Sequence, residues 1–149
     1  MRNLRIPLLA ALLAAGAAAA QAQAPVTATA PKDVLLQADH SWNGAAYTAY
    51  PKGRPELTTL KLTIPAHTAL PWHIHPVPNA GYVLSGTLTI QDRQSGKSHT
   101  YRTGEAFAET VNDVHRGVTG DTPTVLLITY AGVAGTPTSI PVKGEKAEY

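Results

Sequence analysis

The sequence predicts an all-β domain, and three observations support that prediction. Short segments in which apolar and polar residues alternate recur along the chain, as half-buried strands require. Turn-forming residues separate these segments at intervals of roughly 8–12 residues. After the first 24 residues, no stretch shows the 3.6-residue period of an amphipathic helix. A sandwich or barrel of about nine short strands is therefore expected.

The strands are expected in a definite order. Val34–Gln37 is a short first strand, and Leu57–Ile64 has the clearest alternation, with Leu60, Leu62 and Ile64 on one face. A hairpin tip is expected at Arg93–Lys97. The remaining strand candidates are rich in apolar and β-branched residues. They are 82–85, which follows the histidine pair, 87–91, 100–102, 106–111, 114–118, 122–130 and 139–142.

The first 24 residues have the features of a secretory signal peptide. A basic start over Met1–Arg5 precedes the apolar run Ile6–Ala20, and small residues then lead to a cleavage site near Ala24. The alternative is a membrane anchor, but the run has about fifteen residues and a spanning helix needs roughly 20. Residues 1–24 are therefore expected to be removed, which predicts a periplasmic or secreted protein that has no membrane segment after cleavage.

The rest of the chain has the size of one domain. We expect a disordered lead-in over residues 25–32, a β-barrel domain over 33–142 and a polar tail over 143–149. Loss of the signal would leave ten basic and ten acidic side chains, without a basic cluster, so no nucleic-acid partner is expected. The sequence has no cysteine, which excludes disulfides and a cysteine metal site.

Three histidines form the candidate site. His73 and His75 are two residues apart, so on a strand both side chains point to the same face. His115 lies about forty residues further along the chain. Neutral imidazole is the commonest metal ligand, and three such rings leave coordination positions open. The sequence thus predicts a metal site formed by His73, His75 and His115.

The spacing of these residues resembles the two motifs of the cupin superfamily, G-x5-H-x-H-x3–4-E-x6-G and G-x5-P-x-G-x2-H-x3-N. His73, His75 and Gly86 match the first motif, and Gly104 and His115 match the second. The resemblance covers roughly residues 57–132 and is strongest to small, single-domain, exported bacterial cupins. It implies a double-stranded β-helix (jelly-roll) barrel, a bound divalent transition metal ion, a small-molecule ligand and a homodimer.

Several positions depart from the cupin motifs. His67 replaces the first glycine of motif one, and Asn112 replaces the second glycine of motif two. His and Asn are enriched at positive φ, so both residues are expected to preserve the left-handed turns. Thr110 and Thr119 stand at the motif proline and asparagine.

Asn79 stands where the motif has its glutamate ligand. Asn offers a neutral carbonyl oxygen or an amide N–H in place of a charged oxygen, so Asn79 is either a ligand or a residue that orients water or substrate. A site without a carboxylate keeps the full +2 charge of the ion and should favour anionic ligands. Zinc, nickel or copper then become more plausible than iron or manganese.

Glu109 is the candidate replacement carboxylate. It shares a face with Phe107 and Val111, and if that face points into the barrel, Glu109 is a fourth ligand, a general base or a partner of a histidine N–H. If instead Ala106 and Ala108 face inward, Glu109 is a solvated strand residue.

Three functions fit these residues. The first, which we favour, is a metalloenzyme of lyase, isomerase, dioxygenase or hydrolase type, in which the metal polarises a carbonyl or activates water or dioxygen and Glu109 moves the proton. The second is a non-catalytic protein that binds or senses a small molecule or metal. The third is an interaction module whose histidines no longer bind metal.

Overall fold

The computed structural model describes residue 25 and residues 27–149, so the predicted signal peptide lies outside the described residues. The chain divides into two units, one up to Lys32 and one from Asp33 to Tyr149. The described residues of the first unit are exposed and belong to no helix or strand. Among the residues that the structure describes, no helix is long and apolar enough to span a membrane.

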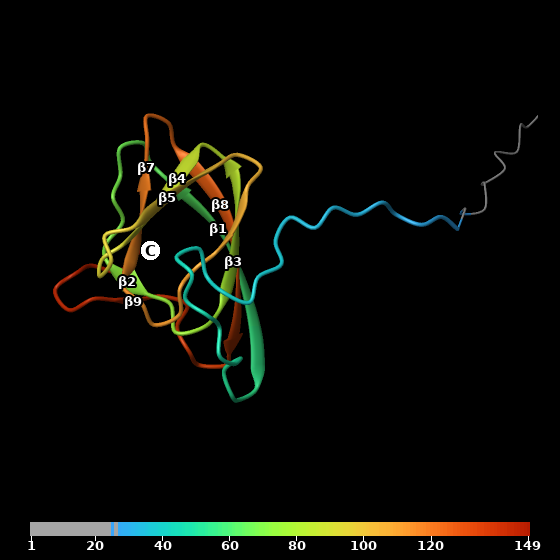
Figure 1. Cartoon of the computed structure of the whole chain (residues 1–149), viewed down its shortest axis with the longest axis horizontal. Coiled ribbons are helices and arrows are strands. Elements are labelled where there is room, and N and C mark those ends of the chain that lie inside the picture. The colour runs from blue at the N-terminus through green and yellow to red at the C-terminus, as the bar shows by residue number, and fades with distance from the viewer. Residues whose placement is uncertain (1–24, 26) are drawn as a thin grey trace, which may run out of the picture. The chain divides into compact units, whose positions relative to one another are not determined.

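The second unit is an all-β fold of two antiparallel sheets, as the sequence predicts (Figure 1). One sheet has the strand order β1-β8-β3-β6, and the other has the order β5-β4-β7-β2-β9. The strands are β1 (Pro55–Ile64), β2 (His73–Ile74), β3 (Asn79–Ser85), β4 (Thr87–Asp92), β5 (Ser98–Arg102), β6 (Ala106–Ala108), β7 (His115–Thr119), β8 (Thr124–Val133) and β9 (Ile140–Pro141).

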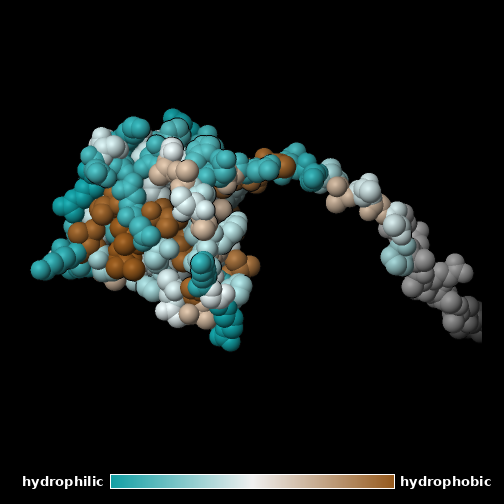
Figure 2. All heavy atoms as spheres, turned by 60° about the horizontal axis from the view of Figure 1, so that its bottom comes forward, coloured by the Kyte–Doolittle hydropathy of each residue, from teal (hydrophilic) through white to brown (hydrophobic). Residues whose placement is uncertain are grey.

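The longest ladder joins β1 to β8, from Pro55↔Val133 to Ile64↔Thr124. Side chains alternate between the two faces of each strand, so one set from each sheet enters the barrel. The core is formed by buried residues from both sheets and from the connection between β2 and β3: Ile64, Val77, Val83, Leu88, Ile90, Phe107, Leu126, Ile128 and Tyr130. Hydrophobic residues also gather over part of the surface of the β domain, bordered by hydrophilic ones (Figure 2).

Phe107 packs directly on the backbone of Gly81 inside this core. The two residues are register partners in β6 and β3, and a Cβ atom placed on Gly81 would lie 2.1 Å from the Phe107 ring. Only glycine therefore allows the ring to approach β3 this closely.

The two expected left-handed turns are confirmed. His67 has φ 51° and Asn112 has φ 57°. The Asn112 N–H donates to His75 O at 2.9 Å, and His75 forms a bridge with Val111. The Asn112 turn therefore ties the connection between β6 and β7 to the histidine-bearing segment.

The prediction of a strand over Val34–Gln37 is wrong. The segment pairs with no strand, and Val34 and Leu35 are 67% and 62% exposed. Its apolar residues resemble a strand locally, but a strand needs a partner edge, and none of the described strands provides one here.

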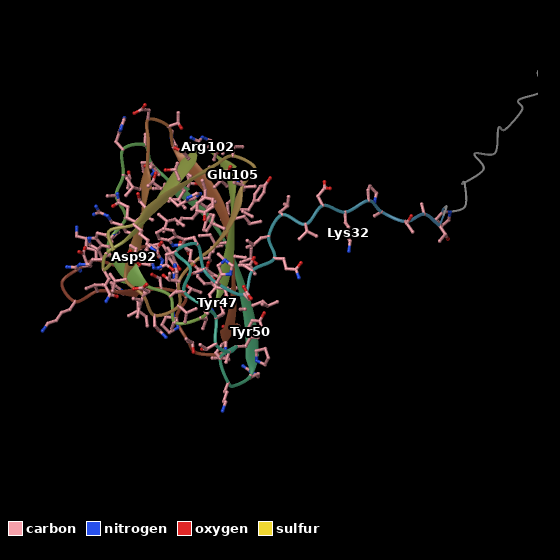
Figure 3. The ribbon with its side chains drawn as sticks, viewed as in Figure 1. Lys32, Tyr47, Tyr50, Asp92, Arg102 and Glu105 are labelled. Atoms are coloured by element: carbon pink, nitrogen blue, oxygen red, sulfur yellow. The ribbon has the colours of Figure 1, made fainter. Side chains whose placement is uncertain are left out.

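The following residues are instead attached to the barrel by polar contacts. Trp42 N–H donates to Ala108 O at 2.9 Å, and the Tyr47 hydroxyl donates to Glu109 O at 2.5 Å. The Asn43 amide donates to the carboxylate of Asp92 at 3.0 Å. Figure 3 labels Tyr47 and Asp92, which mark two of these attachment points.

Candidate metal centre

The three histidines meet inside the barrel because of how β2 and β7 pair. His73 opens β2, His115 opens β7, and the two are register partners. His75 follows β2 and, two residues from His73, points to the same face. All three rings are at most 1% exposed. Their ligand nitrogens lie within 4.8 Å of one another, so the expected convergence of the three rings is found.

Main-chain carbonyl groups fix the orientation of each ring. Nδ1 of His73 lies 2.8 Å from Pro71 O, and Nδ1 of His75 lies 2.7 Å from Thr138 O. Nδ1 of His115 lies 2.9 Å from Asp113 O, and the Thr110 hydroxyl is 3.0 Å from the same nitrogen.

A carbonyl oxygen can only accept a hydrogen bond, so each Nδ1 carries the proton and donates. In the neutral rings each Nε2 then presents a lone pair to the shared space between them. This arrangement is the usual one for metal-bound histidines, in which the second ring nitrogen is held by an oxygen acceptor.

Glu109 faces into the barrel with Phe107, so the alternative of a solvated Glu109 is wrong. It is 6% exposed, its Oε2 lies 3.0 Å from Nε2 of His75, and its Oε1 lies 3.7 Å from Nε2 of His115. Ala108 is buried as well, on the other side of the strand, where Trp42 approaches its carbonyl oxygen.

Charge at the centre shifts the pKa values of these groups in opposite directions. Burial raises the pKa of Glu109, but the adjacent His75 outweighs burial and holds that pKa below its ordinary value. Burial lowers the pKa of His75, but Glu109 outweighs it and raises that pKa. Burial lowers the pKa of His73 to about 4 and also lowers that of His115. Without metal, His75 and Glu109 therefore form the ion pair, and the other two rings are neutral.

Asn79 is inside the barrel but makes no hydrogen bond. It is 6% exposed, it pairs in register with Tyr130, and both polar atoms of its amide lack a hydrogen-bond partner within the described residues. A buried amide without partners is costly and is free to bind a ligand or water.

Glu148 is a residue of this site that the sequence analysis missed. It belongs to the predicted polar tail, yet its side chain is 5% exposed and its Oε2 lies 3.4 Å from Nε2 of His73. Burial raises the pKa of Glu148 to about 7. No local pattern marks it, because its burial depends on where the tail folds.

The donor set of the centre fits a metal ion. Three buried polar atoms without a hydrogen-bond partner lie beside the Glu109–His75 ion pair: Nε2 of His73, Nε2 of His115 and Oε2 of Glu148. Each carries a lone pair, and a divalent cation would satisfy all of them. Imidazole nitrogen and carboxylate oxygen are ligands that zinc, iron, nickel and manganese all accept.

Comparison with known proteins supports the fold. A family model described as a cupin domain matches residues 60–130. No curated protein matches the sequence. A crystal structure of the DMSP lyase DddQ from Ruegeria pomeroyi DSS-3 has a TM-score of 0.53 at 20% identity, over 61% of this chain and 45% of that one.

Two further structures share the fold. An oxalate decarboxylase from Lactobacillus farciminis has a TM-score of 0.50 at 15% identity, over 58% of this chain and 26% of that one. An uncharacterized Klebsiella pneumoniae protein with a double-stranded beta-helix domain has the same TM-score and identity, over 65% of this chain and 91% of that one. The chain spans less than half the length of the lyase and the decarboxylase. The family match and these folds together identify a cupin domain over residues 60–130 of this chain.

Proposed function

We propose that this protein is an exported metalloenzyme that binds one divalent transition metal ion through His73, His75, His115 and Glu109 and acts on a small molecule. The observation that carries the proposal is the set of three Nδ1–H donors held by main-chain carbonyls, which aims three Nε2 lone pairs at one point. Nothing in a purely structural role requires three buried rings to be oriented in this way.

Glu109 and Asn79 are the groups for chemistry at this centre. When bound, the metal ion supplies a Lewis acid. Glu109 reaches two of the three rings, so it is either the fourth ligand or the base that accepts a proton from a bound molecule. Asn79, with its free amide, orients that molecule. Lyase, isomerase, dioxygenase and hydrolase reactions all fit.

Glu109 also changes the expectation for the metal. The sequence suggested a centre without a carboxylate and hence zinc, nickel or copper. A buried carboxylate 3.0 Å from His75 supplies one negative charge and a hard oxygen ligand. The preference against iron and manganese therefore weakens.

A non-catalytic protein that binds or senses a small molecule is the second candidate. One observation favours the related case of a protein that binds or senses only the metal: the Glu148 carboxylate beside His73 occupies space that a substrate would need. Turnover of any substrate that disappears after chelation would exclude this second candidate.

We also propose that the protein forms a homodimer through the outer face of the β1-β8-β3-β6 sheet. Leu57, Leu84 and Leu127 are 75%, 42% and 39% exposed there. These exposed leucines offer apolar area on the outer face of the sheet for such a contact.

Metal analysis of the processed protein, purified without a histidine tag after expression with several metals, tests the main proposal. We expect about one divalent ion per chain in the wild type, and a loss of at least tenfold in His75→Ala. His99→Ala is the matched control, because His99 is exposed and lies on β5. Equal metal content in the wild type and His75→Ala would refute the metal centre. Mass spectrometry of the exported chain, with a new N-terminus after Ala24, tests export.

A further inference from the structure

The segment that follows β8 returns to the strand that carries two of the histidines. β9 pairs with β2 through His73↔Pro141 and Ile74↔Ile140. Beyond β9, Val142 N–H donates to Trp72 O at 2.9 Å. The chain is therefore fixed beside the metal centre immediately before the last seven residues begin.

These residues, Lys143–Tyr149, bring the Glu148 carboxylate into the barrel. Its Oε2 lies 3.4 Å from Nε2 of His73, and both atoms are buried without a hydrogen-bond partner among the described residues. His73 donates its Nδ1–H to Pro71 O, so Nε2 of the neutral ring faces the carboxylate with a lone pair. When Glu148 is ionised, two lone pairs face each other in a buried site and repel, whereas a cation between them accepts both.

Few contacts hold Glu148 in this position. Residues 143–147 are exposed. The Tyr149 hydroxyl makes the polar contacts of the segment end, with Thr138 Oγ1 at 2.7 Å and the Tyr130 hydroxyl at 3.5 Å. Glu109, in contrast, directly follows β6 and its main-chain oxygen accepts from Tyr47. Release of Glu148 would thus break little packing, unlike release of Glu109.

The charges of the centre indicate what kind of group could replace the Glu148 carboxylate. Three neutral imidazoles, a divalent ion and the carboxylate of Glu109 leave one positive charge, which the carboxylate of Glu148 neutralises. A molecule that displaces Glu148 preserves this balance if it presents one negative charge through oxygen atoms. A carboxylate group has this charge and the same ligand atoms.

On the basis of the proposed metal site, we infer that Glu148 is an exchangeable ligand of the metal ion and holds the coordination position that a carboxylate group of the small-molecule ligand takes. The segment Lys143–Tyr149 then closes the centre when no such molecule is bound, and it leaves when one binds.

Cobalt binding with acetate as the probe tests the inference. The variants are Glu148→Gln, a chain truncated after Val142, and the matched control Glu145→Gln, which removes an exposed carboxylate from the same segment. We expect the wild type and Glu145→Gln to share one Co²⁺ absorption spectrum. Glu148→Gln and the truncated chain should bind Co²⁺ at least tenfold more weakly, show a changed spectrum, and bind acetate about tenfold more tightly.

Trypsin provides a readout that does not depend on the spectrum. Lys143 and Lys146 are exposed cleavage sites in the segment. Co²⁺ should slow cleavage after Lys146 in the wild type and Glu145→Gln, and acetate should reverse this protection. In Glu148→Gln, Co²⁺ should leave the cleavage rate unchanged.

The outcomes separate the two proposals. If Glu148→Gln behaves as Glu145→Gln in spectrum, acetate affinity and cleavage, Glu148 is not a ligand, while the metal centre stands. If wild-type protein binds no more Co²⁺ than His75→Ala, the metal centre itself is refuted and this inference fails with it. If the truncated chain does not fold, the comparison of Glu148→Gln with Glu145→Gln decides alone.

Discussion

His73 and His115 are register partners across β2 and β7, and their ring centroids lie 4.7 Å apart. β2 has two residues, and only His73 of them pairs with β7. The strand ladder at this point is therefore short, and a metal ion shared by the two rings would join the strands more firmly than that ladder does. Metal binding and stability are thus expected to be linked.

Zinc should raise the unfolding free energy of the metal-free protein. At a free zinc concentration of about 1,000 times Kd, the expected gain is about 4 kcal/mol. Urea denaturation with and without zinc measures it, and His75→Ala should show no gain. An equal gain in His75→Ala would mean that zinc binds elsewhere.

Metal binding should release a proton from His75. Without metal, burial opposes the charge on this ring, but Glu109 outweighs burial and raises the His75 pKa above 6.5. Zinc needs the Nε2 lone pair, so below that raised pKa the proton must leave, and the apparent affinity should rise with pH until the pKa is passed.

Calorimetry in buffers of different ionisation enthalpy measures this proton release. In Glu109→Gln the carboxylate no longer raises the His75 pKa, so the release should move to lower pH and the zinc affinity should fall at least tenfold. Glu56→Gln, an exposed change on β1, is the control. A wild-type affinity that is constant from pH 5 to 8, a window set by ordinary histidine titration, would contradict the ion pair.

Gly81→Ala should destabilise the fold by about 3 kcal/mol or more, because the new Cβ would overlap the Phe107 ring. Gly132→Ala is the control, since its Cβ would meet neighbours only at 3.4 Å and beyond. Chemical denaturation of both variants gives the two values. In Gly81→Ala, a second change Phe107→Leu should recover part of the loss, and purely additive effects would contradict direct packing.

Asp92→Asn should lower the unfolding free energy by about 2 kcal/mol at pH 7, because the carboxylate accepts charge-assisted hydrogen bonds from Ser95 and Asn43. Burial raises the pKa of Asp92, but these hydrogen bonds outweigh it and lower the pKa. A carboxyl group with a lowered pKa stabilises the fold at pH values above its ordinary pKa of about 3.9. This stabilisation is lost as the pH falls through the lowered pKa.

The difference in unfolding free energy between wild type and Asp92→Asn should therefore become smaller below about pH 4. Urea denaturation over a pH series measures it. The exposed Asp121→Asn is the control and should change stability by less than about 0.5 kcal/mol. A difference that persists unchanged to low pH would mean that the charge of Asp92 contributes nothing.

Leu127→Arg should convert the proposed dimer to a monomer. Leu127 lies between Lys61 and Tyr82 in the registers of β1-β8-β3, so an arginine there would place a second cation beside Lys61 on the apolar face. Light scattering after gel filtration measures the mass, with Lys97→Glu at the hairpin tip as the control. A wild-type protein that is already monomeric would refute the dimer.

The sequence predicted those parts of the fold that depend on local pattern or on motif spacing. The alternation in Leu57–Ile64 marked β1, and the H-x-H pair with His115 located the candidate centre. The prediction of positive φ at His67 and Asn112 is confirmed because the motif requires a left-handed turn and these residue types tolerate it.

The errors concern segments whose placement depends on distant partners. Val34–Gln37 has the composition of a strand but no edge to pair with. Glu148 looks like a solvated tail residue, and only the pairing of β9 with β2 carries it to His73. The inward direction of Glu109 could be stated only as one of two phases, since apolar residues occupy both faces of that segment.

The carbonyl groups that orient the three rings belong to the main chain, at Pro71, Thr138 and Asp113. Substitutions of the side chains at these positions leave their carbonyl groups in place. Side chains around the centre can therefore change without re-aiming the imidazoles. Ligand specificity can therefore change through side-chain substitutions, by design or by evolution, while the main chain keeps the geometry of the three ligand nitrogens.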